Sequence, residues 1–210
     1  GVIGFHLSKY LLNKKYNIVG LDNLNNYYDK KIKINRLNIL KGFKNFRFLK
    51  IDIINLNRLK NAFKKYKFEK VIHLAAQAGV RFSISNPDSY IQNNIQGFQN
   101  ILELSRLYKI KHLVYASSSS VYGLNKKTPF SEKNSASHPI STYAASKRSN
   151  ELMAHVYSNL YNLPTTGLRF FTVYGPFGRP DMSLFKFVNL TLKNKKIDLF
   201  NKGNHTRDFT

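Results

Sequence analysis

Tyr143 and Lys147 have the residue types and the spacing needed to remove a proton from an alcohol. They lie four residues apart, so on a helix they share one face and the ammonium can sit beside the phenol. A phenol has an ordinary pKa of about 10 and is a weak base at neutral pH. A nearby cation favours its ionised form. The pair can therefore accept a hydroxyl proton while hydride leaves the same carbon for a nicotinamide.

A serine-rich segment upstream strengthens this interpretation. Residues 117–120 are all serine, and they precede Val121-Tyr122-Gly123. A serine hydroxyl from a second segment can share the proton of the substrate with the tyrosine. By itself Tyr-x-x-x-Lys is a weak signal, because tyrosine and lysine are common here and an isolated match indicates a solvated helix turn. The two motifs together favour a catalytic site.

Short apolar runs alternate with longer segments along the chain. The runs predict strands at residues 17–22, 46–51, 70–75, 112–116 and 165–170. The longer segments predict helices at residues 3–13, 30–40, 56–66, 90–108 and 142–161. This alternation predicts an α/β fold, a Rossmann-like doubly wound parallel sheet with right-handed crossovers and helices on both faces. Residues 124–141 form the longest predicted loop.

Both ends of the chain shape the expected domain organisation. The sequence starts at Gly1 without methionine and enters a helix directly. A doubly wound nucleotide fold has an apolar strand and a glycine turn at this point. We therefore expect a fragment whose N-terminal strand is missing. Residues 1–175 are expected to form the NAD-binding domain, truncated at its N-terminus, and residues 176–210 to begin a small substrate-binding region, truncated at its C-terminus.

Composition narrows the class of protein. The 210 residues are 42% hydrophobic and 14% aromatic, enough for a sizeable core. The chain has no cysteine, which excludes a disulfide framework and a thiolate metal site. Its six histidines show no metal-binding spacing, so we expect no metal. No apolar run approaches the roughly 18 residues of a membrane span, and no secretory leader is seen. We expect a cytoplasmic protein without a membrane partner.

The charge is strongly positive. Lys+Arg 34 against Asp+Glu 11 gives a net charge of +23, a balance also found in nucleic-acid-binding proteins. The lysines are dispersed, however, and no predicted element carries a basic stripe. Together with the abundant asparagine, isoleucine and tyrosine, this favours a compositional bias of the genome as the cause. We therefore expect no nucleic-acid partner.

Two glycines and one aspartate indicate a dinucleotide site. Gly1 and Gly4 fit the last two glycines of a G-x-x-G-x-x-G phosphate turn. Asp22 ends the next predicted strand, where a carboxylate accepts hydrogen bonds from the adenosine ribose hydroxyls. Because a carboxylate there repels a 2′-phosphate, NAD is favoured over NADP. The alternative is that Asp22 only forms a strand-end turn, helped by Asn23.

Two further polar residues allow more than one interpretation. Asp52 follows a predicted strand and suits either a contact with the adenine edge or a cap of the next helix. His73 lies inside an apolar run, which favours a core histidine over a ligand or a base.

With these motifs in place, the chain resembles the extended short-chain dehydrogenase/reductase family, and within it the NAD-dependent nucleotide-sugar epimerases and dehydratases. The segments that carry the resemblance are residues 1–8, 22–29, 73–81, 115–123 and 168–182. The resemblance covers essentially the whole chain.

The resemblance implies a role for individual residues. The implied catalytic residues are Ser118, Tyr143 and Lys147. The implied cofactor-binding residues are Gly1, Val2, Ile3, Gly4, Asp22, Asn23, Asp52, Ile53, Leu74, Ala75, Ala76, Asn94, Ser117, Tyr143, Lys147 and Val173. The implied substrate-binding residues are Gln77, Arg81, Ser118, Ser119, Thr172, Arg179 and Arg207. Arginine suits such a pocket, because its guanidinium binds carboxylates and phosphates through two hydrogen bonds.

The implied reaction is a redox-neutral epimerisation of a UDP-sugar with NAD as cofactor, and UDP-glucuronate is the favoured substrate. Dehydratases and decarboxylases of this family resemble Thr-Asp-Glu or Thr-Ser-Glu before the Val-Tyr-Gly, whereas this chain has Ser120 in place of the acid. The absence of that acid favours epimerisation without elimination. Arg179 is the candidate for holding the sugar carboxylate. The alternatives are an epimerase or dehydratase acting on a neutral nucleotide sugar, or a non-catalytic nucleotide-binding module. The resemblance also implies a homodimer for the full-length protein.

Overall fold

The computed structural model describes residues 1–204, 206 and 208–210, without the side chains of residues 200 and 201. The chain divides into two compact units. Unit 1 comprises Gly1–Lys50 and Phe171–Thr210, and unit 2 comprises Ile51–Phe170. The division predicted from the sequence, at residue 175, stays a prediction.

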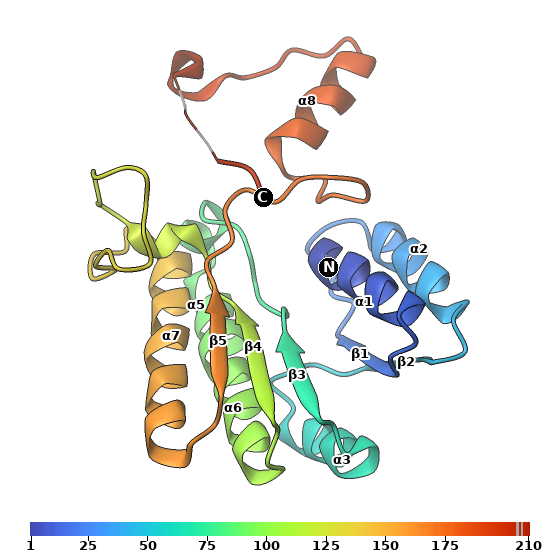
Figure 1. Cartoon of the computed structure of the whole chain (residues 1–210). Coiled ribbons are helices and arrows are strands. Elements are labelled where there is room, and N and C mark those ends of the chain that lie inside the picture. The colour runs from blue at the N-terminus through green and yellow to red at the C-terminus, as the bar shows by residue number, and fades with distance from the viewer. Residues whose placement is uncertain (205, 207) are drawn as a thin grey trace. The chain divides into compact units, whose positions relative to one another are not determined.

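Unit 1 contains two parallel strands with two helices packed on them. Its elements are α1 (Val2–Asn13), β1 (Ile18–Asp22), α2 (Lys30–Lys41), β2 (Phe46–Lys50), α8 (Ser183–Leu192) and the 3-10 turn η3 (Phe200–Gly203), as Figure 1 shows. In the ladder, Ile18 lies opposite Phe46 and Asp22 opposite Lys50. A cluster of buried apolar side chains forms the core of this unit: Phe5, Leu12, Leu37, Leu40 and Phe46.

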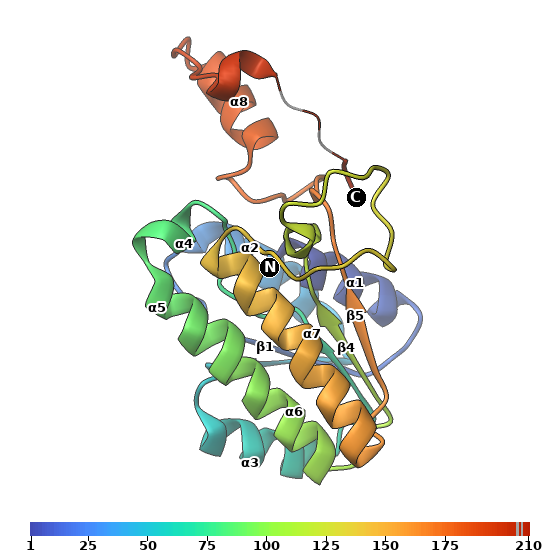
Figure 2. The same ribbon diagram turned by 90° about the vertical axis from the view of Figure 1, so that its left-hand side faces the viewer.

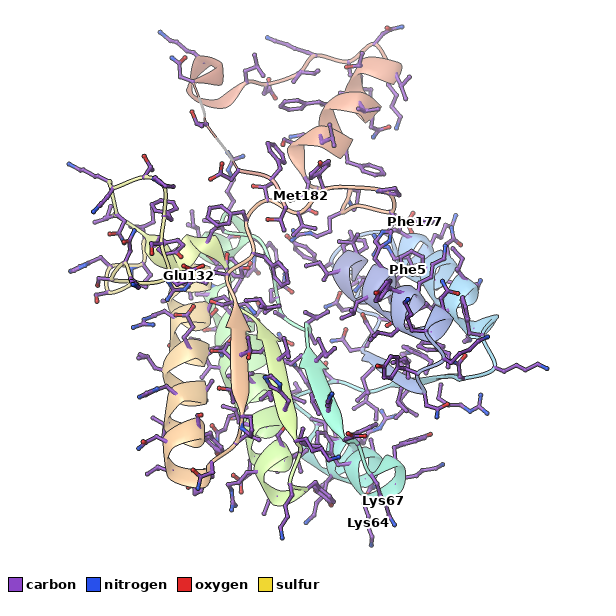
Figure 3. All side chains as sticks on the ribbon, viewed as in Figure 1. Phe5, Lys64, Lys67, Glu132, Phe177 and Met182 are labelled. Carbon is purple, nitrogen blue, oxygen red and sulfur yellow. The ribbon has the colours of Figure 1, made fainter. Side chains whose placement is uncertain are left out.

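The loop before α8 is held against α1 and α2. The ring of Phe177 lies 5.1 Å from the ring of Phe5, and both side chains are labelled in Figure 3. His6 Nε2 makes a 2.8 Å hydrogen bond with the carbonyl of Pro176. The buried guanidinium of Arg36 donates to the carbonyls of Phe177 and Gly178. These contacts fix the backbone immediately before Arg179.

Unit 2 contains a parallel sheet of three strands in the order β3-β4-β5. Its elements are α3 (Leu56–Tyr66), β3 (Lys70–His73), α4 (Phe82–Ser85), α5 (Pro87–Tyr90), the π-helix η1 (Ile91–Gln96), α6 (Gly97–Leu107), β4 (His112–Ala116), the 3-10 turn η2 (Ser119–Tyr122), α7 (Thr142–Tyr161) and β5 (Thr165–Leu168). Figure 2 shows α5, η1 and α6 as one continuous helical segment beside α7. The ring of Phe98 on α6 packs against Tyr115 on β4, with 5.0 Å between ring centroids.

Helices of unit 2 cover one face of this sheet. Successive strands lie side by side in chain order, so right-handed crossovers return their helices to the same face. His73 points to the covered face, where its ring stacks on Phe98 at 5.4 Å. The next side chain back along β3, Ile72, points the other way and is 43% exposed. The predicted cover of the second face stays a prediction.

Most predicted elements match the structure to within two residues. The exception is the helix predicted at residues 90–108, which consists of α5, η1 and α6. The π-helical turn contains Asn94, whose side chain is 1% exposed and hydrogen-bonded to other segments. Gly97 begins α6 beside Ile53, and a Cβ there would lie 2.6 Å from the Ile53 side chain. A side chain at this position would therefore have to displace the side chain of Ile53.

In the part of the chain that the structure describes, no helix combines the length and apolar character needed to cross a membrane.

Candidate active site

Helix α7 carries Tyr143 and Lys147 in its first two turns. Its N-terminus is fixed by Ser141, whose hydroxyl accepts a 3.1 Å hydrogen bond from the amide of Ala144. Lys147 is 2% exposed, and its Nζ donates a 2.9 Å hydrogen bond to the carbonyl of Ala116 at the end of β4. Burial lowers the pKa of Lys147 to about 8. The lysine is thus a buried cation fixed between α7 and the sheet.

The serine segment continues directly from β4. Ser118 precedes the turn η2 and is 7% exposed, and its Oγ accepts a 3.2 Å hydrogen bond from the amide of Ser120. A hydroxyl that accepts this bond still carries a hydrogen that it can donate. The turn ends at Gly123, where φ is +54° and a Cβ would lie 1.9 Å from the carbonyl oxygen of His138. Because α7 packs on η2, the structure brings the serine segment to the helix of Tyr143 and Lys147.

Tyr143 is oriented by a buried aromatic neighbour. Its ring meets the ring of Tyr90 edge-on, with 6.0 Å between centroids. Tyr90 is fully buried, and its hydroxyl donates toward the carbonyls of Ala78 (3.0 Å) and Gly79 (2.5 Å). The phenol predicted to act as the base therefore packs on a rigid element.

A buried amide network surrounds Asn94. Its Oδ1 accepts from the amide of Gln77 at 2.8 Å, and its Nδ2 donates to the Gln77 carbonyl and to Ser146 Oγ, both at 3.0 Å. Asn150 Nδ2 donates to the Asn94 carbonyl at 2.7 Å. The Asn94 side chain thus joins the loop after β3 to α7. Ser146 and Asn150 were not among the predicted site residues, although both follow Tyr143 at helical spacing on the buried face of α7.

His73 is a core histidine, as predicted. It is 6% exposed, and burial, together with the charge of Lys147, lowers its pKa to about 3. The ring is therefore neutral over the physiological range and does not act as a base there.

The dinucleotide residues of unit 1 form a separate cluster. Asp22 Oδ2 lies 3.6 Å from the nitrogen of Gly1, while Oδ1 accepts a 2.7 Å hydrogen bond from the amide of Leu24. Asp22 thus forms the strand-end turn and also directs a carboxylate oxygen toward the first glycine. Gly1 caps α1 without a side-chain hydrogen bond, with Val2 buried and Ile3, Gly4 and Asn23 partly buried beside it. An open helix N-terminus beside an acidic strand end fits the pyrophosphate and ribose of NAD.

Asp52 and Ile53 lie near the start of unit 2. Asp52 Oδ1 accepts from the amide of Ile54 at 3.1 Å, and the helix cap of α3 is Asn55, which accepts from Arg58. The prediction that Asp52 caps this helix was therefore wrong. Leu74, Ala75 and Ala76 follow β3 and are partly buried. The adenine and nicotinamide contacts of these residues stay predictions.

The predicted substrate residues belong to both units. In unit 2, Gln77 is buried and Arg81 is exposed at the start of α4, while Ser119 is partly buried in η2. In unit 1, Thr172, Val173 and Arg179 line one pocket. Arg207 lies outside the described residues.

Arg179 is held by its own loop. Its Nε donates to Asp181 Oδ1 at 3.0 Å and its Nη2 pairs with Asp181 Oδ2. The guanidinium also lies 5.8 Å from the centre of the Tyr27 ring, and Tyr27 hydrogen-bonds to Asp181 at 3.4 Å. The arginine is thus oriented at the pocket rather than left as a long unsupported side chain.

The fold and these clusters define an α/β protein of the Rossmann-like class with a tyrosine, lysine and serine at a strand end. Residues 1–210 match the family model described as the NAD dependent epimerase/dehydratase family, and the chain belongs to that family. The predictions of fold class and of NAD as the cofactor of the family are confirmed.

Similar proteins are longer than this chain. Protein CapI from Staphylococcus aureus is 55% identical over all 210 residues, which span 63% of its length. A probable UDP-glucuronate 4-epimerase from Rhizobium meliloti is 47% identical over 210 residues, the whole of this chain and 62% of that protein. The crystal structure of UDP-glucuronic acid 4-epimerase from Bacillus cereus, in complex with UDP-glucuronic acid and NAD, superposes with a TM-score of 0.92 and 36% identity. That match covers all of this chain and 66% of the other.

Proposed function

We propose that the protein is an NAD-dependent 4-epimerase that interconverts UDP-glucuronate and UDP-galacturonate through a 4-keto sugar. The observation that carries the proposal is the arrangement in unit 2, where buried Lys147 joins the helix of Tyr143 to the strand end that leads into Ser118. The choice of sugar is supported by the likeness to the Rhizobium meliloti and Bacillus cereus proteins.

The residues of this cluster have complementary roles in the proposed reaction. Tyr143, as phenolate, accepts the proton of the C4″ hydroxyl, and the Lys147 ammonium favours that ionised form. Ser118 donates its remaining hydrogen to the same oxygen and orients the sugar. NAD, when bound, would supply the acceptor and the donor of the C4″ hydride. The 4-keto sugar turns over in the pocket before hydride returns to its other face, and Tyr143 then gives the proton back to the C4″ oxygen.

Ser120 separates epimerisation from elimination. Elimination of water from a keto sugar needs a further acid or base near the neighbouring carbons. In this chain the position is a serine whose amide is bonded to Ser118 Oγ. The local chemistry therefore supports epimerisation over dehydration.

We assign Arg179 to the sugar carboxylate. A 4-keto glucuronate is a β-keto acid, so its carboxylate must be kept out of the alignment in which CO₂ leaves. Asp181 fixes the guanidinium of Arg179 through Nε and Nη2. The guanidinium carries five N–H donors in a fixed fork, and we assign donors that are not directed at Asp181 to the sugar carboxylate.

Each unit by itself contains residues that suit a part of the cofactor. In unit 1, Gly1, Gly4 and the N-terminus of α1 would hold the pyrophosphate, and Asp22 the adenosine ribose. In unit 2, Lys147 and Tyr143 would hold the nicotinamide ribose.

The test is product analysis with the intact protein. UDP-glucuronate is incubated with the protein and NAD, and the nucleotide sugars are separated by chromatography. We expect an equilibrium mixture with UDP-galacturonate and much slower conversion of UDP-glucose. Faster conversion of UDP-glucose, or a dehydrated product, would move the proposal to a neutral sugar. Stoichiometric NAD binding without turnover of either sugar would indicate a non-catalytic nucleotide-binding module.

A further inference from the structure

Glu151 lies one turn beyond Lys147 on α7, and none of the roles described above uses it. Its side chain is 11% exposed. The Oε1 atom accepts hydrogen bonds from Ser117 Oγ at 2.6 Å and from Arg169 Nε at 2.8 Å. The Oε2 atom accepts from Arg169 Nη2 at 2.9 Å and from Arg148 at 2.8 Å. Four hydrogen bonds thus hold this mostly buried carboxylate in one position within unit 2.

Lys147 and Glu151 hold two successive residues, the last of β4 and the first of the serine segment. Lys147 donates to the carbonyl of Ala116, and Glu151 accepts from the hydroxyl of Ser117. Two contacts from one helix face fix both the position and the direction of the backbone. The next residue along that backbone is Ser118. Any slip of the strand end along α7 would therefore move Ser118 relative to Tyr143.

Arg169 joins the third element to this arrangement. It follows β5, between Leu168 and Phe170, whose carbonyls accept from the amides of Ser117 (2.8 Å) and Ser119 (2.9 Å). Its guanidinium reaches Glu151 and also lies 4.8 Å from the centre of the Tyr122 ring. The backbone at the end of β5 and just after it thus holds the serine segment on both sides of Ser118, while the Arg169 side chain contacts Glu151.

Glu151 acts as a fixed anion. Burial by itself would raise the pKa of Glu151, but hydrogen bonds from two arginines and from Ser117 lower it below its ordinary value. The carboxylate stays ionised at neutral pH and carries no proton to give.

We propose that Glu151 is a positioning residue, which holds the Ser117 backbone so that Ser118 meets the substrate in line with Tyr143. The inference rests on the proposed epimerase function. It predicts an effect on the chemical step and little effect on substrate binding, because Glu151 touches the serine segment rather than a ligand.

The test is Glu151→Gln in the intact protein, with wild type measured in the same assay. The amide keeps the size of the side chain but loses the charge that binds two arginines. A displacement near 1 Å can cost about 100-fold in rate, so we expect kcat to fall by roughly 10- to 100-fold. The KM for UDP-glucuronate should change by less than about 3-fold, because the substitution removes no contact with the substrate.

Glu103→Gln is the matched control. Glu103 on α6 also pairs with an arginine three residues on, Arg106, and accepts from Tyr157, but has no contact with the serine segment among those described. Its kcat should stay at the wild-type value. Equal losses in the two variants would overturn the proposal, because they would show general loosening of the helices.

Ser117→Ala keeps the proposal testable if Glu151→Gln does not fold. It removes one hydroxyl of the same contact, so kcat should fall while KM and the melting temperature hold. Wild-type kcat in either variant overturns the inference. If wild type converts only UDP-glucose, the proposed substrate is refuted, and the variants can still be compared with wild type on that sugar. If wild type converts neither sugar, both the epimerase function and the role of Glu151 are refuted.

Discussion

The hydroxyl of Tyr143 is the proposed proton acceptor, and phenylalanine differs from tyrosine by that oxygen alone. Tyr143→Phe keeps the ring that packs edge-on against Tyr90. We expect turnover to fall by roughly two or more powers of ten, the usual worth of general-base catalysis, with unchanged affinity for UDP-glucuronate. Steady-state kinetics and calorimetry measure the two quantities. Turnover near the wild-type rate would remove Tyr143 as the base.

Asp22 controls the proposed choice between the two dinucleotides. The charge of Lys33 acts on Asp22, and that cation would remain after Asp22→Ala. We expect weaker NAD binding and stronger NADP binding in the variant, because the carboxylate that repels the 2′-phosphate is gone. Fluorescence titration with both reduced cofactors gives the ratio of affinities. A ratio equal to that of wild type would leave Asp22 with only its turn-forming bond to Leu24.

Protonation of His73 makes the free energy of unfolding depend on pH. Its pKa is about 3 in the folded chain and 6.5 ordinarily, so below pH 6.5 only the unfolded chain takes up the proton. Stability from this residue is therefore lost as the pH falls from 6.5 toward 3. Between pH 7 and pH 5 we expect a loss of about 2 kcal/mol in the free energy of unfolding. Urea unfolding of wild type and His73→Gln at both pH values measures it, and an equal loss in the variant would contradict it.

At the scale of elements, the strands and α1, α2, α3 and α7 were predictable because apolar periodicity determines them. The π-helical turn was not, because it depends on where Gln77 and Ser146 meet Asn94 in the fold. The pair Tyr143 and Lys147 was visible as a helical spacing.

The Glu151 cluster was only partly visible in the sequence. Its i,i+3 pair with Arg148 can be read from helical spacing. Its bonds to Ser117 and Arg169 join three elements that the sequence cannot place side by side.

Helix α7 also carries an apolar stripe on its outer face. Leu152, Val156 and Leu160 follow at intervals of four, and they are 53%, 48% and 62% exposed. An exposed stripe of this type favours pairing with another copy of the chain, in line with the expected homodimer.

Val156→Lys should therefore convert the intact protein to a monomer, because a charge would replace the centre of the stripe. Sedimentation velocity measures the change, with Ile84→Lys as the control at an exposed residue of α4. A wild-type monomer, or a variant that still dimerises, would place the interface elsewhere.

At the scale of the whole molecule, the chain spans about 63% of the length of the first curated relatives that it matches. The family model matches all 210 of its residues. The candidate catalytic cluster lies within unit 2, and the Asp22 cluster lies within unit 1. Activity, substrate and oligomeric state therefore have to be measured on the intact protein.

The most direct measurement uses UDP-glucuronate labelled with deuterium at C4″. If Tyr143 moves only the hydroxyl proton and the carbon-bound hydrogen travels as hydride, water never exchanges with the label. The intact protein should give UDP-galacturonate that retains deuterium at C4″ in ordinary water, as read by mass spectrometry and proton NMR. Product that has lost the label to solvent would contradict the proposed oxidation and reduction at C4″.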